Sequence, residues 1–312
     1  MDWSKTKIHC SSLCGVMASN GGKSGQEILD DAIEERDKKN AAFEKLKTKD
    51  GIQGGKLLAR LDELDKLIPE LELKKDEPEP LTKGCKTFLT GIYAYEKYHK
   101  WNPVKDIGSR ATEKGKIVEP EAIAMVSILD NVLLEKNEER IENEWFSGLP
   151  DAIEINDLGE VVIHDVKCPE NIETYFSVIG KELVWQYYWQ MQGYMDLTGA
   201  KIAKIHYCLL NTPEHQIKDM AGAMLRRMNV ISEYSPEYIE AEKQLIFNLT
   251  YDDIPLKEKK WTILVQRNDE DILRARKRVE MCREYLAEFE ELHLSCETPE
   301  FSRTLSYETP EK

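Results

Sequence analysis

The stretch from Ser147 to Pro169 reads SGLPDAIEINDLGEVVIHDVKCP and decides how the fold of this chain is interpreted. Two apolar runs flank the polar sequence NDLG, whose last residue, Gly159, can take a positive φ. The pattern predicts two short antiparallel strands joined by a turn. If AIEI pairs with VVIH in this hairpin, Asp151 comes to lie beside Asp165.

The second strand of the hairpin carries an acid and a lysine on one face. Residues i and i+2 of a strand point the same way, so Asp165 and Lys167 share a face with the apolar residues at 161 and 163. Two carboxylates as close as Asp151 and Asp165 repel each other unless a cation lies between them. Hard oxygen ligands select Mg²⁺ or Mn²⁺ over zinc, and Mg²⁺ uses only one or two protein carboxylates beside its waters.

A water bound to such an ion can lose a proton and become the nucleophile of a phosphodiester hydrolysis. The Lys167 ammonium can orient that water, or help to deprotonate it if burial lowers its pKa. An acid-x-lysine triplet also arises by chance, and a surface strand often carries mixed charge. The preceding Gly-Leu-Pro-Asp and the apolar run at 161–163 favour the catalytic interpretation, because ionic groups at the end of a buried strand need a partner or a metal.

These residues resemble the PD-(D/E)XK nuclease superfamily and, within it, the lambda-type phage exonucleases (YqaJ-like viral recombinases). A second block, GKIVEPEA at 115–122, resembles the family's G-x3-E-x2-A helix, which supplies a further acid. Glu119 is the matching position and Glu121 the near alternative. Pro120 departs from the pattern, because proline is unusual inside a helix beyond its first turn.

Two more blocks follow the order of the family. The sequence WQMQGYM at 189–195 resembles its Gln-rich helix, in which Gln190 and Tyr194 lie one helical turn apart. The sequence HCSSL at 9–13 resembles its Ser-containing N-terminal motif, with Ser12 as the best positional match. The charged segment from about 25 to 80 has no counterpart in the family.

The resemblance implies an α/β fold of the restriction-endonuclease-like type, a central mixed sheet flanked by helices, here with a helical arm insertion. It implies a Mg²⁺-dependent deoxyribonuclease, with Mn²⁺ as a substitute, that acts as a 5′–3′ exonuclease on double-stranded DNA ends in phage-type recombination. Such an enzyme leaves a 3′ single strand for a single-strand annealing protein. Family members often form trimers that encircle DNA, so a homo-oligomer is expected.

The resemblance also implies a role for each matching residue. Metal would be held by Asp151, Asp165, the Val166 carbonyl and Glu119; Lys167 would act on the attacking water; Gln190 and Tyr194 would steady the site or contact the DNA backbone; and Ser11 and Ser12 would hold the 5′ phosphate.

The net charge of −15 is the main objection to a DNA-binding protein, since nucleic-acid binding usually shows as an excess of Lys and Arg. The objection is met if basic groups line a local channel while the acids face solvent, because the distribution of charge decides binding. The acids are concentrated at residues 27–44 and 63–79.

Several other classes of protein are disfavoured. The seven cysteines are odd in number and include no C-x2-C pair, which favours a reduced protein and disfavours an iron-sulfur cluster. The six histidines form no H-x3-H pair, so a zinc site is unsupported. The chain shows no membrane span and no signal peptide, and we expect it in the cytoplasm, that of the host cell if it is viral.

Four segments are expected along the chain: residues 1–24 with the Ser motif and a turn at 20–22, a charged helical arm at 25–80, a nuclease core at 81–297, and a disordered tail at 298–312. Helices are expected over 25–47, 56–68, 82–98, 116–134, 174–197 and 270–292, and strands over 202–210 and 261–266. Pro69 is expected to end or kink the second helix. The aromatic residues at 185–189 are expected to pack in the core, and the basic residues at 274–278 to form a solvated face.

Two alternatives remain open at this point. One is a structure-specific endonuclease on the same scaffold. The other is a non-catalytic module that binds DNA or protein, which the acidity and the arm mildly favour and the intact acid-x-lysine disfavours.

Overall fold

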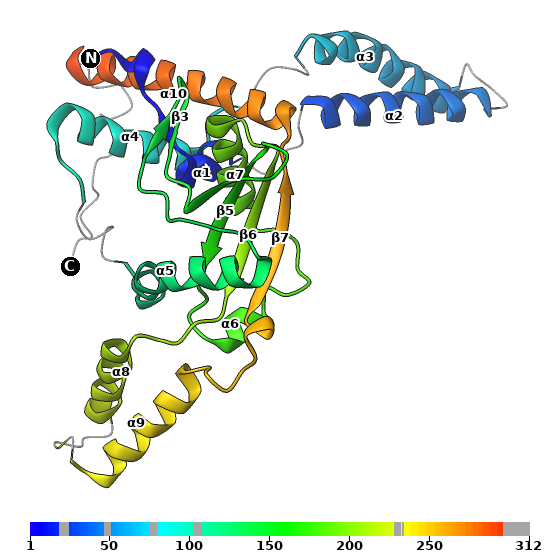
Figure 1. Cartoon of the computed structure of the whole chain (residues 1–312). Coiled ribbons are helices and arrows are strands. Elements are labelled where there is room, and N and C mark those ends of the chain that lie inside the picture. The colour runs from blue at the N-terminus through cyan, green and yellow to red at the C-terminus, as the bar shows by residue number, and fades with distance from the viewer. Residues whose placement is uncertain are drawn as a thin grey trace, which may run out of the picture. The chain divides into compact units, whose positions relative to one another are not determined.

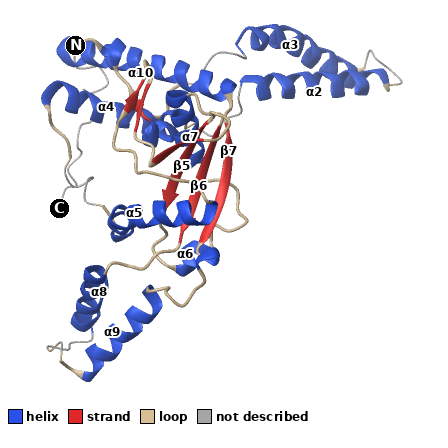
Figure 2. Cartoon of the chain, viewed as in Figure 1, coloured by secondary structure: helices blue, strands red, loops and turns tan. Residues whose placement is uncertain are grey.

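The computed structural model describes residues 1–18, 25–46, 51–74, 80–102, 108–227, 232 and 234–295. The turn expected at 20–22 and the tail expected from 298 lie outside these residues. The chain divides into two compact units: unit 1 comprises Met1–Met17 with Leu89–Lys312, and unit 2 comprises Ala18–Phe88. The elements of both are labelled in Figure 1 and coloured by type in Figure 2.

Unit 1 is built on a four-stranded mixed sheet in the order β4-β5-β6-β7, drawn in red in Figure 2. The strands are β4 (Ala152–Ile155), β5 (Val161–Lys167), β6 (Ile202–Cys208) and β7 (Lys260–Gln266). β5 pairs antiparallel with β4 and parallel with β6, and β6 pairs antiparallel with β7. The α/β class and the mixed sheet predicted from the sequence are therefore confirmed.

The predicted hairpin is confirmed in its register. Ala152 lies opposite His164, and the turn closes with the Gly159 N–H donating to the Asn156 carbonyl at 2.8 Å. Gly159 has a φ of 75°, the left-handed conformation that glycine takes without steric cost.

A second, three-stranded sheet precedes the hairpin in the order β1-β3-β2. Its strands are β1 (Ile8–His9), β2 (Ile141–Glu142) and β3 (Phe146–Gly148). β1 pairs parallel with β3, so the N-terminal segment lies beside the strand that leads into Asp151. After β1 the chain forms a 3-10 turn, Cys10–Ser12, and the short helix α1 (Leu13–Met17), preceded near the terminus by the 3-10 turn Trp3–Lys5.

Helices cover both faces of the four-stranded sheet. α5 (Arg110–Asp130) packs on one face, where Val118, Ala122 and Val126 form a buried cluster with Ala152 and Val166. α7 (Trp185–Thr198) contacts β5 and β6. Figure 1 shows α5 crossing the sheet near the tip of the β5 arrow, and α7 at the other end.

Two predicted helices of unit 1 differ from the structure. α5 begins at Arg110 and not at 116, because the Ser109 hydroxyl caps it by accepting from the Thr112 N–H. Pro120 therefore lies inside the helix. The single helix expected at 174–197 is wrong: α6 (Ile172–Phe176) ends early, Gly180 takes a φ of 71° in the connection, and α7 starts at Trp185.

The closing helix α10 (Asp269–Ser295) is confirmed, but its basic residues are not a uniformly solvated face. Arg278 is buried and donates to the Val16 carbonyl at 3.1 Å. Arg276 pairs with the buried Asp196 at 2.6 Å and lies over the Trp145 ring. Among the aromatic residues of α7, Trp189 is fully buried, as expected, whereas Trp185 is exposed.

The remaining elements of unit 1 include α4, α8 and α9. α4 (Lys83–Tyr98) is confirmed as a helix and crosses the unit boundary in sequence. α8 (Glu214–Arg227) and α9 (Pro236–Leu249) contact each other and are inserted between β6 and β7, followed by the 3-10 turn Leu256–Glu258. The Gln216 amide of α8 donates to Glu113 at 3.0 Å, which ties the insertion to the start of α5.

Unit 2 contains a pair of packed helices, both of which lie within residues 25–80. α2 (Gly25–Glu44) and α3 (Ile52–Lys74) bury a small cluster composed of Leu29, Ala32, Leu64 and Ile68. Arg60 of α3 makes two hydrogen bonds to Glu35 of α2, at 3.0 and 2.9 Å. Pro69 neither ends α3 nor stops its pairing, since the helix continues to Lys74.

A polar chain crosses the α5 face of the sheet. Glu154 contacts His164 at 2.8 Å, His164 contacts His206 at 3.0 Å, and His206 contacts Thr262 at 3.0 Å, so one group from each of the four strands takes part. The two imidazole rings are stacked and fully buried. Burial lowers the pKa of both histidines, that of His206 to about 3, so each contributes one donor and one acceptor as a neutral ring.

In the part of the chain that the structure describes, no helix has an apolar stretch long enough to cross a membrane.

Candidate active site

The hairpin register brings together the two aspartates predicted from the sequence. Since Ala152 lies opposite His164, Asp151 lies opposite Asp165. Asp151 Oδ2 accepts from the Val166 N–H at 2.7 Å, which fixes its carboxylate against β5. Asp151 is therefore positioned by the backbone of the strand that carries the other acid.

Asp165 is fully buried, and its carboxylate is poorly satisfied. Lys167 Nζ forms an ion pair with Asp165 Oδ2 at 2.6 Å, whereas Asp165 Oδ1 has no hydrogen-bond partner among the described residues. The side chain of Lys167 keeps 23% of its surface exposed, while that of Asp165 keeps 1%. The Lys167 ammonium also lies 4.9 Å from the centre of the Tyr187 ring. A buried carboxylate with unused acceptors is costly unless something else binds it.

Burial and mutual repulsion shift the pKa values of the site. Burial and then the charge of Asp165 raise the pKa of Asp151 to about 7. Burial acts to lower the pKa of Lys167, but the charges of Asp165 and Asp151 outweigh it and raise that pKa above its usual value. Lys167 thus carries its proton, which favours orienting a water over deprotonating one.

Gln190 and Tyr194 hold the backbone in front of Asp151. Gln190 Nε2 donates to the Tyr194 hydroxyl at 2.9 Å, and that hydroxyl donates to the Leu149 carbonyl at 3.1 Å. A Cβ on Gly148 would lie 2.7 Å from the Tyr194 ring, so only glycine permits this approach. Gln190 and Tyr194 therefore form no hydrogen bond to the acids themselves, and instead position the loop that carries Asp151.

Glu119 lies on α5 near the aspartates but faces a lysine that the sequence reasoning missed. Its Oε1 is 2.9 Å from Lys136 Nζ. Glu119 is close enough that its charge contributes to the raised pKa of Asp151, after burial and Asp165. Lys136 could not be found from the sequence, because its pairing with Glu119 depends on a backbone bridge to Ala152 that no local sequence pattern indicates.

Ser11 and Ser12 lie in the 3-10 turn that follows β1, Ser11 exposed and Ser12 half-buried. The preceding Cys10 packs on α7, where a Cβ on Gly193 would lie 2.8 Å from its Sγ. Arg140, which the sequence reasoning also missed, contacts His9 Nδ1 at 3.2 Å and donates to the Ser147 hydroxyl at 3.3 Å. The Ser motif is thus connected to the Asp151 loop through β3 and α7, with a guanidinium beside it.

These residues fit a divalent ion held by few protein ligands. The described residues contain no gathering of three or more acidic, His or Cys side chains arranged as a cage. Asp165 nevertheless offers an unbonded Oδ1 beside Asp151, and Mg²⁺ is commonly bound through one or two carboxylates with water and substrate phosphate. Asp151, Asp165 and Glu119 are the residues that would hold the ion, with the Val166 carbonyl next in sequence.

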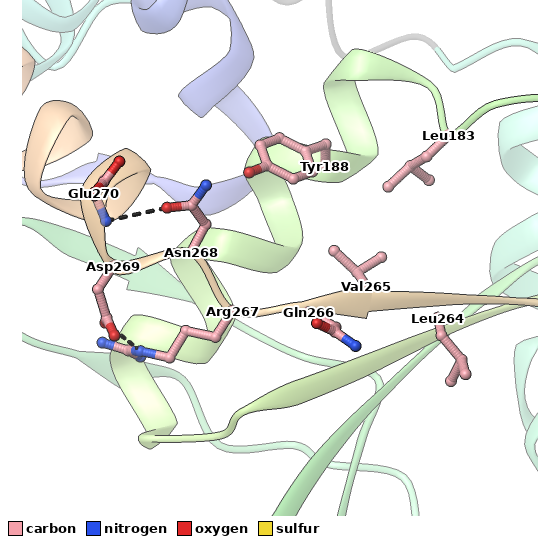
Figure 3. Close-up of a pocket in the computed structure, with 9 residues that line it drawn as sticks. All are labelled: Leu183, Tyr188, Leu264, Val265, Gln266, Arg267, Asn268, Asp269 and Glu270. Carbon is pink, nitrogen blue, oxygen red and sulfur yellow. Dashed lines mark hydrogen bonds and ion pairs between the residues drawn. The ribbon is translucent and has the colours of Figure 1, made fainter.

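A pocket of about 550 Å³ lies elsewhere, where β7 meets the starts of α7 and α10. Figure 3 shows its lining, in which the Asn268 side chain accepts from the Glu270 N–H and Arg267 pairs with Asp269. None of its lining residues is a predicted site residue. The contacts drawn there stabilise the start of α10, so the pocket is separate from the acidic pair.

Solved structures show what this fold is similar to. A phage-related exonuclease from Haemophilus somnus 129PT matches with a TM-score of 0.56 and 21% identity, over 93% of this chain and 97% of that chain. An alkaline exonuclease (LHK-Exo) from Laribacter hongkongensis matches less well, with a TM-score of 0.46 and 17% identity over 69% of this chain and 87% of that chain. Compared by sequence, no protein-family model and no curated protein matches the chain.

The first of these structures shows that this chain has the fold of a phage-related exonuclease. The resemblance to phage exonucleases found in the sequence blocks is thereby confirmed for the fold.

Proposed function

We propose that this protein is a metal-dependent deoxyribonuclease. The observation that supports it most is the buried carboxylate of Asp165, which lies beside Asp151 and pairs with the Lys167 ammonium through Oδ2 but leaves Oδ1 without a hydrogen-bond partner among the described residues. A folded protein accepts that arrangement at a cost, and a divalent ion would offset the cost by binding the free oxygens. The fold shared with a phage-related exonuclease adds a second, independent line of support.

The residues have distinct parts in this proposal. Asp151 and Asp165 would hold the ion, with Glu119 as a third ligand, and the ion when bound would lower the pKa of its water and stabilise charge on the phosphate. Lys167 orients the attacking water with its ammonium, which the two acids keep protonated. Tyr194 and Gln190 keep the Asp151 loop in place through the Leu149 carbonyl.

We further propose the finer activity of a 5′–3′ exonuclease on double-stranded DNA ends, cofactor Mg²⁺ or Mn²⁺, with a single-strand annealing protein as a partner. Ser12 and Ser11, with Arg140 nearby, would hold a terminal 5′ phosphate, since hydroxyl and guanidinium donors suit that group. Cutting would depend little on sequence, because phosphate contacts carry no base information. Assembly into a trimer around DNA is part of the same proposal.

A direct assay tests the proposal and separates it from the alternatives. The purified chain is incubated with linear and with circular duplex DNA, each with Mg²⁺ and with EDTA. Loss of linear DNA alone, abolished by EDTA, is the expected result. Loss of both substrates would indicate an endonuclease, and loss of neither, with binding retained, would indicate a non-catalytic module. Asp165→Asn is the matched control, because it keeps the volume and removes the charge.

Polarity and end preference need separate substrates. Duplexes labelled at one 5′ or one 3′ end, each with and without a 5′ phosphate, report which strand shortens and whether the phosphate is used. Release of mononucleotides from phosphorylated 5′ ends is expected. Shortening from 3′ ends would contradict the proposed direction while leaving the nuclease itself intact.

A further inference from the structure

Lys136 belongs to a short segment that is tied to the Asp151 loop by its backbone. It bridges to Ala152, and Ala152 lies opposite His164, so Lys136 points to the face of the sheet that α5 covers. Its neighbour Asn137 donates from its backbone N–H to the Asp151 carbonyl at 2.8 Å and from its side chain to the Pro150 carbonyl at 3.0 Å. Lys136 is therefore held in register with the acids.

The Lys136 ammonium pairs with one acid of the candidate site and lies within electrostatic range of a second. It lies 2.9 Å from Glu119 Oε1, and Glu119 followed by Asp151 contributes to raising the pKa of Lys136. Glu119 is the third predicted metal ligand, but in this structure its carboxylate is engaged by the lysine. A divalent ion at the aspartate pair and the lysine would thus compete for the same carboxylate.

The pairing of Lys136 differs from that of Lys167 in how easily it can be exchanged. The side chains of Lys136 and Glu119 keep 43% and 22% of their surface exposed, against 23% and 1% for Lys167 and Asp165. Exposed ion pairs are weak because water and salt screen them. Glu119 can therefore separate from Lys136 at a small cost in free energy, because water can solvate both side chains. The Asp165 side chain is not exposed to water, so its separation from Lys167 would cost more.

We propose that Lys136 is a positioning residue that holds Glu119 as a displaceable counter-ion until a divalent cation binds the Glu119 carboxylate in its place. This inference rests on the proposed function, because it assumes a cation site at Asp151 and Asp165. It assigns Lys136 a part in setting the affinity for the ion, by competition for Glu119.

The test measures Mn²⁺ binding and needs no turnover. Free Mn²⁺ is followed by electron paramagnetic resonance during titration of the full chain, in the forms native, Lys136→Gln, Glu119→Gln and the double variant. Lys136→Gln is expected to tighten Mn²⁺ binding about three- to tenfold in the presence of Glu119, and by much less when residue 119 is Gln. Lys136→Arg, which retains the charge, is expected to bind Mn²⁺ as the native chain does.

Two controls make the result specific. Lys218→Gln removes the same charge from an ion pair on α8, Lys218 with Glu214 at 2.5 Å, and should leave Mn²⁺ affinity unchanged. Circular dichroism melting checks that each variant folds. Equal tightening by Lys136→Gln with and without Glu119, or equal tightening by Lys218→Gln, would overturn the proposal, since net charge alone would then explain the effect.

Failure of this inference can be told apart from failure of the proposed function. If native Mn²⁺ binding is lost in Asp165→Asn but unchanged in Lys136→Gln, the site stands and the role of Lys136 is wrong. If the native chain binds no Mn²⁺ that depends on Asp165, both are wrong.

Discussion

The two faces of β5 carry buried polar groups of opposite kinds. On the face toward α5, His164 belongs to a chain of hydrogen bonds from Glu154 to Thr262 in which each ring nitrogen has a partner. On the other face, Asp165 Oδ2 is paired with the Lys167 ammonium at 2.6 Å, while Asp165 Oδ1 has no hydrogen-bond partner among the described residues. Satisfied polar groups stabilise and specify a fold, while an unsatisfied one marks a place where the protein accepts a cost for function.

The largest effect on DNA cleavage is expected on the face of β5 that carries Asp165 and Lys167. Lys167→Ala should reduce DNA cleavage about 10²–10⁴-fold, because the attacking water loses the group that orients it. DNA binding, measured by fluorescence anisotropy in Ca²⁺, should change little. Lys201→Ala is the matched control, since Lys201 is exposed and pairs only loosely with Glu160 at 3.8 Å. Full cleavage by Lys167→Ala would remove this lysine from the mechanism.

On the face of β5 toward α5, where the buried polar groups are hydrogen-bonded, a substitution should lower the stability of the protein and leave DNA cleavage unchanged. His206→Ala leaves a cavity and deprives both His164 and Thr262 of their partner, so the free energy of unfolding should fall by about 2–4 kcal/mol. Urea unfolding measures this loss. The cleavage rate per folded molecule should stay close to native. A variant that keeps its stability but loses cleavage would mean that the polar chain serves the reaction.

The hydrogen-bonded series from Glu154 to Thr262 also predicts that the stability of the protein depends on pH. The pKa of His206 is about 3 in the folded protein and about 6.5 when unfolded, so the unfolded chain takes up the proton first and stability falls as pH falls below 6.5. Between pH 7 and pH 5 this group should remove about 2 kcal/mol. Asp151 acts in the opposite sense, because its raised pKa, about 7, favours the folded state as pH falls.

The contribution of His206 is therefore measured as a difference. The stability advantage of the native chain over His206→Asn should shrink by about 2 kcal/mol between pH 7 and pH 5. Urea unfolding of both proteins across this range provides the comparison. An advantage that stays constant or grows would show that the buried imidazole accepts a proton without loss.

The smallest effect is expected from neutralising the unsatisfied carboxylate. Asp165→Asn should change the free energy of unfolding by no more than about 1 kcal/mol, because the lost repulsion with Asp151 offsets the lost ion pair with Lys167, which stays partly exposed and near Asp151. Thermal melting without metal measures this change. Cleavage should be lost in the same variant. Marked destabilisation would mean that the ion pair with Lys167 is structural.

Features set by local pattern could be predicted from the sequence. The hairpin register follows from alternation and from the turn at Gly159, and it places Asp151 opposite Asp165. The contact between Gln190 and Tyr194 follows from their spacing of one helical turn. Each of these depends on residues that are near one another in the chain.

Features set by long-range packing could not be predicted. The pairing of Lys136 with Glu119 depends on a bridge to Ala152 and on where α5 crosses the sheet. Arg278 looked like part of a charged surface, yet it is buried against the Val16 carbonyl, 262 residues away in sequence. His164 and His206 have partners only because four strands align, and no single strand shows that alignment.

The most direct test of the account is the position of a bound ion. Crystals grown with Mn²⁺ and measured at the manganese absorption edge should show an anomalous peak at coordination distance from a carboxylate oxygen of Asp151 and of Asp165, with Lys167 beside it. An ordered site with both side chains resolved, no ion between them and Mn²⁺ bound elsewhere would contradict the account.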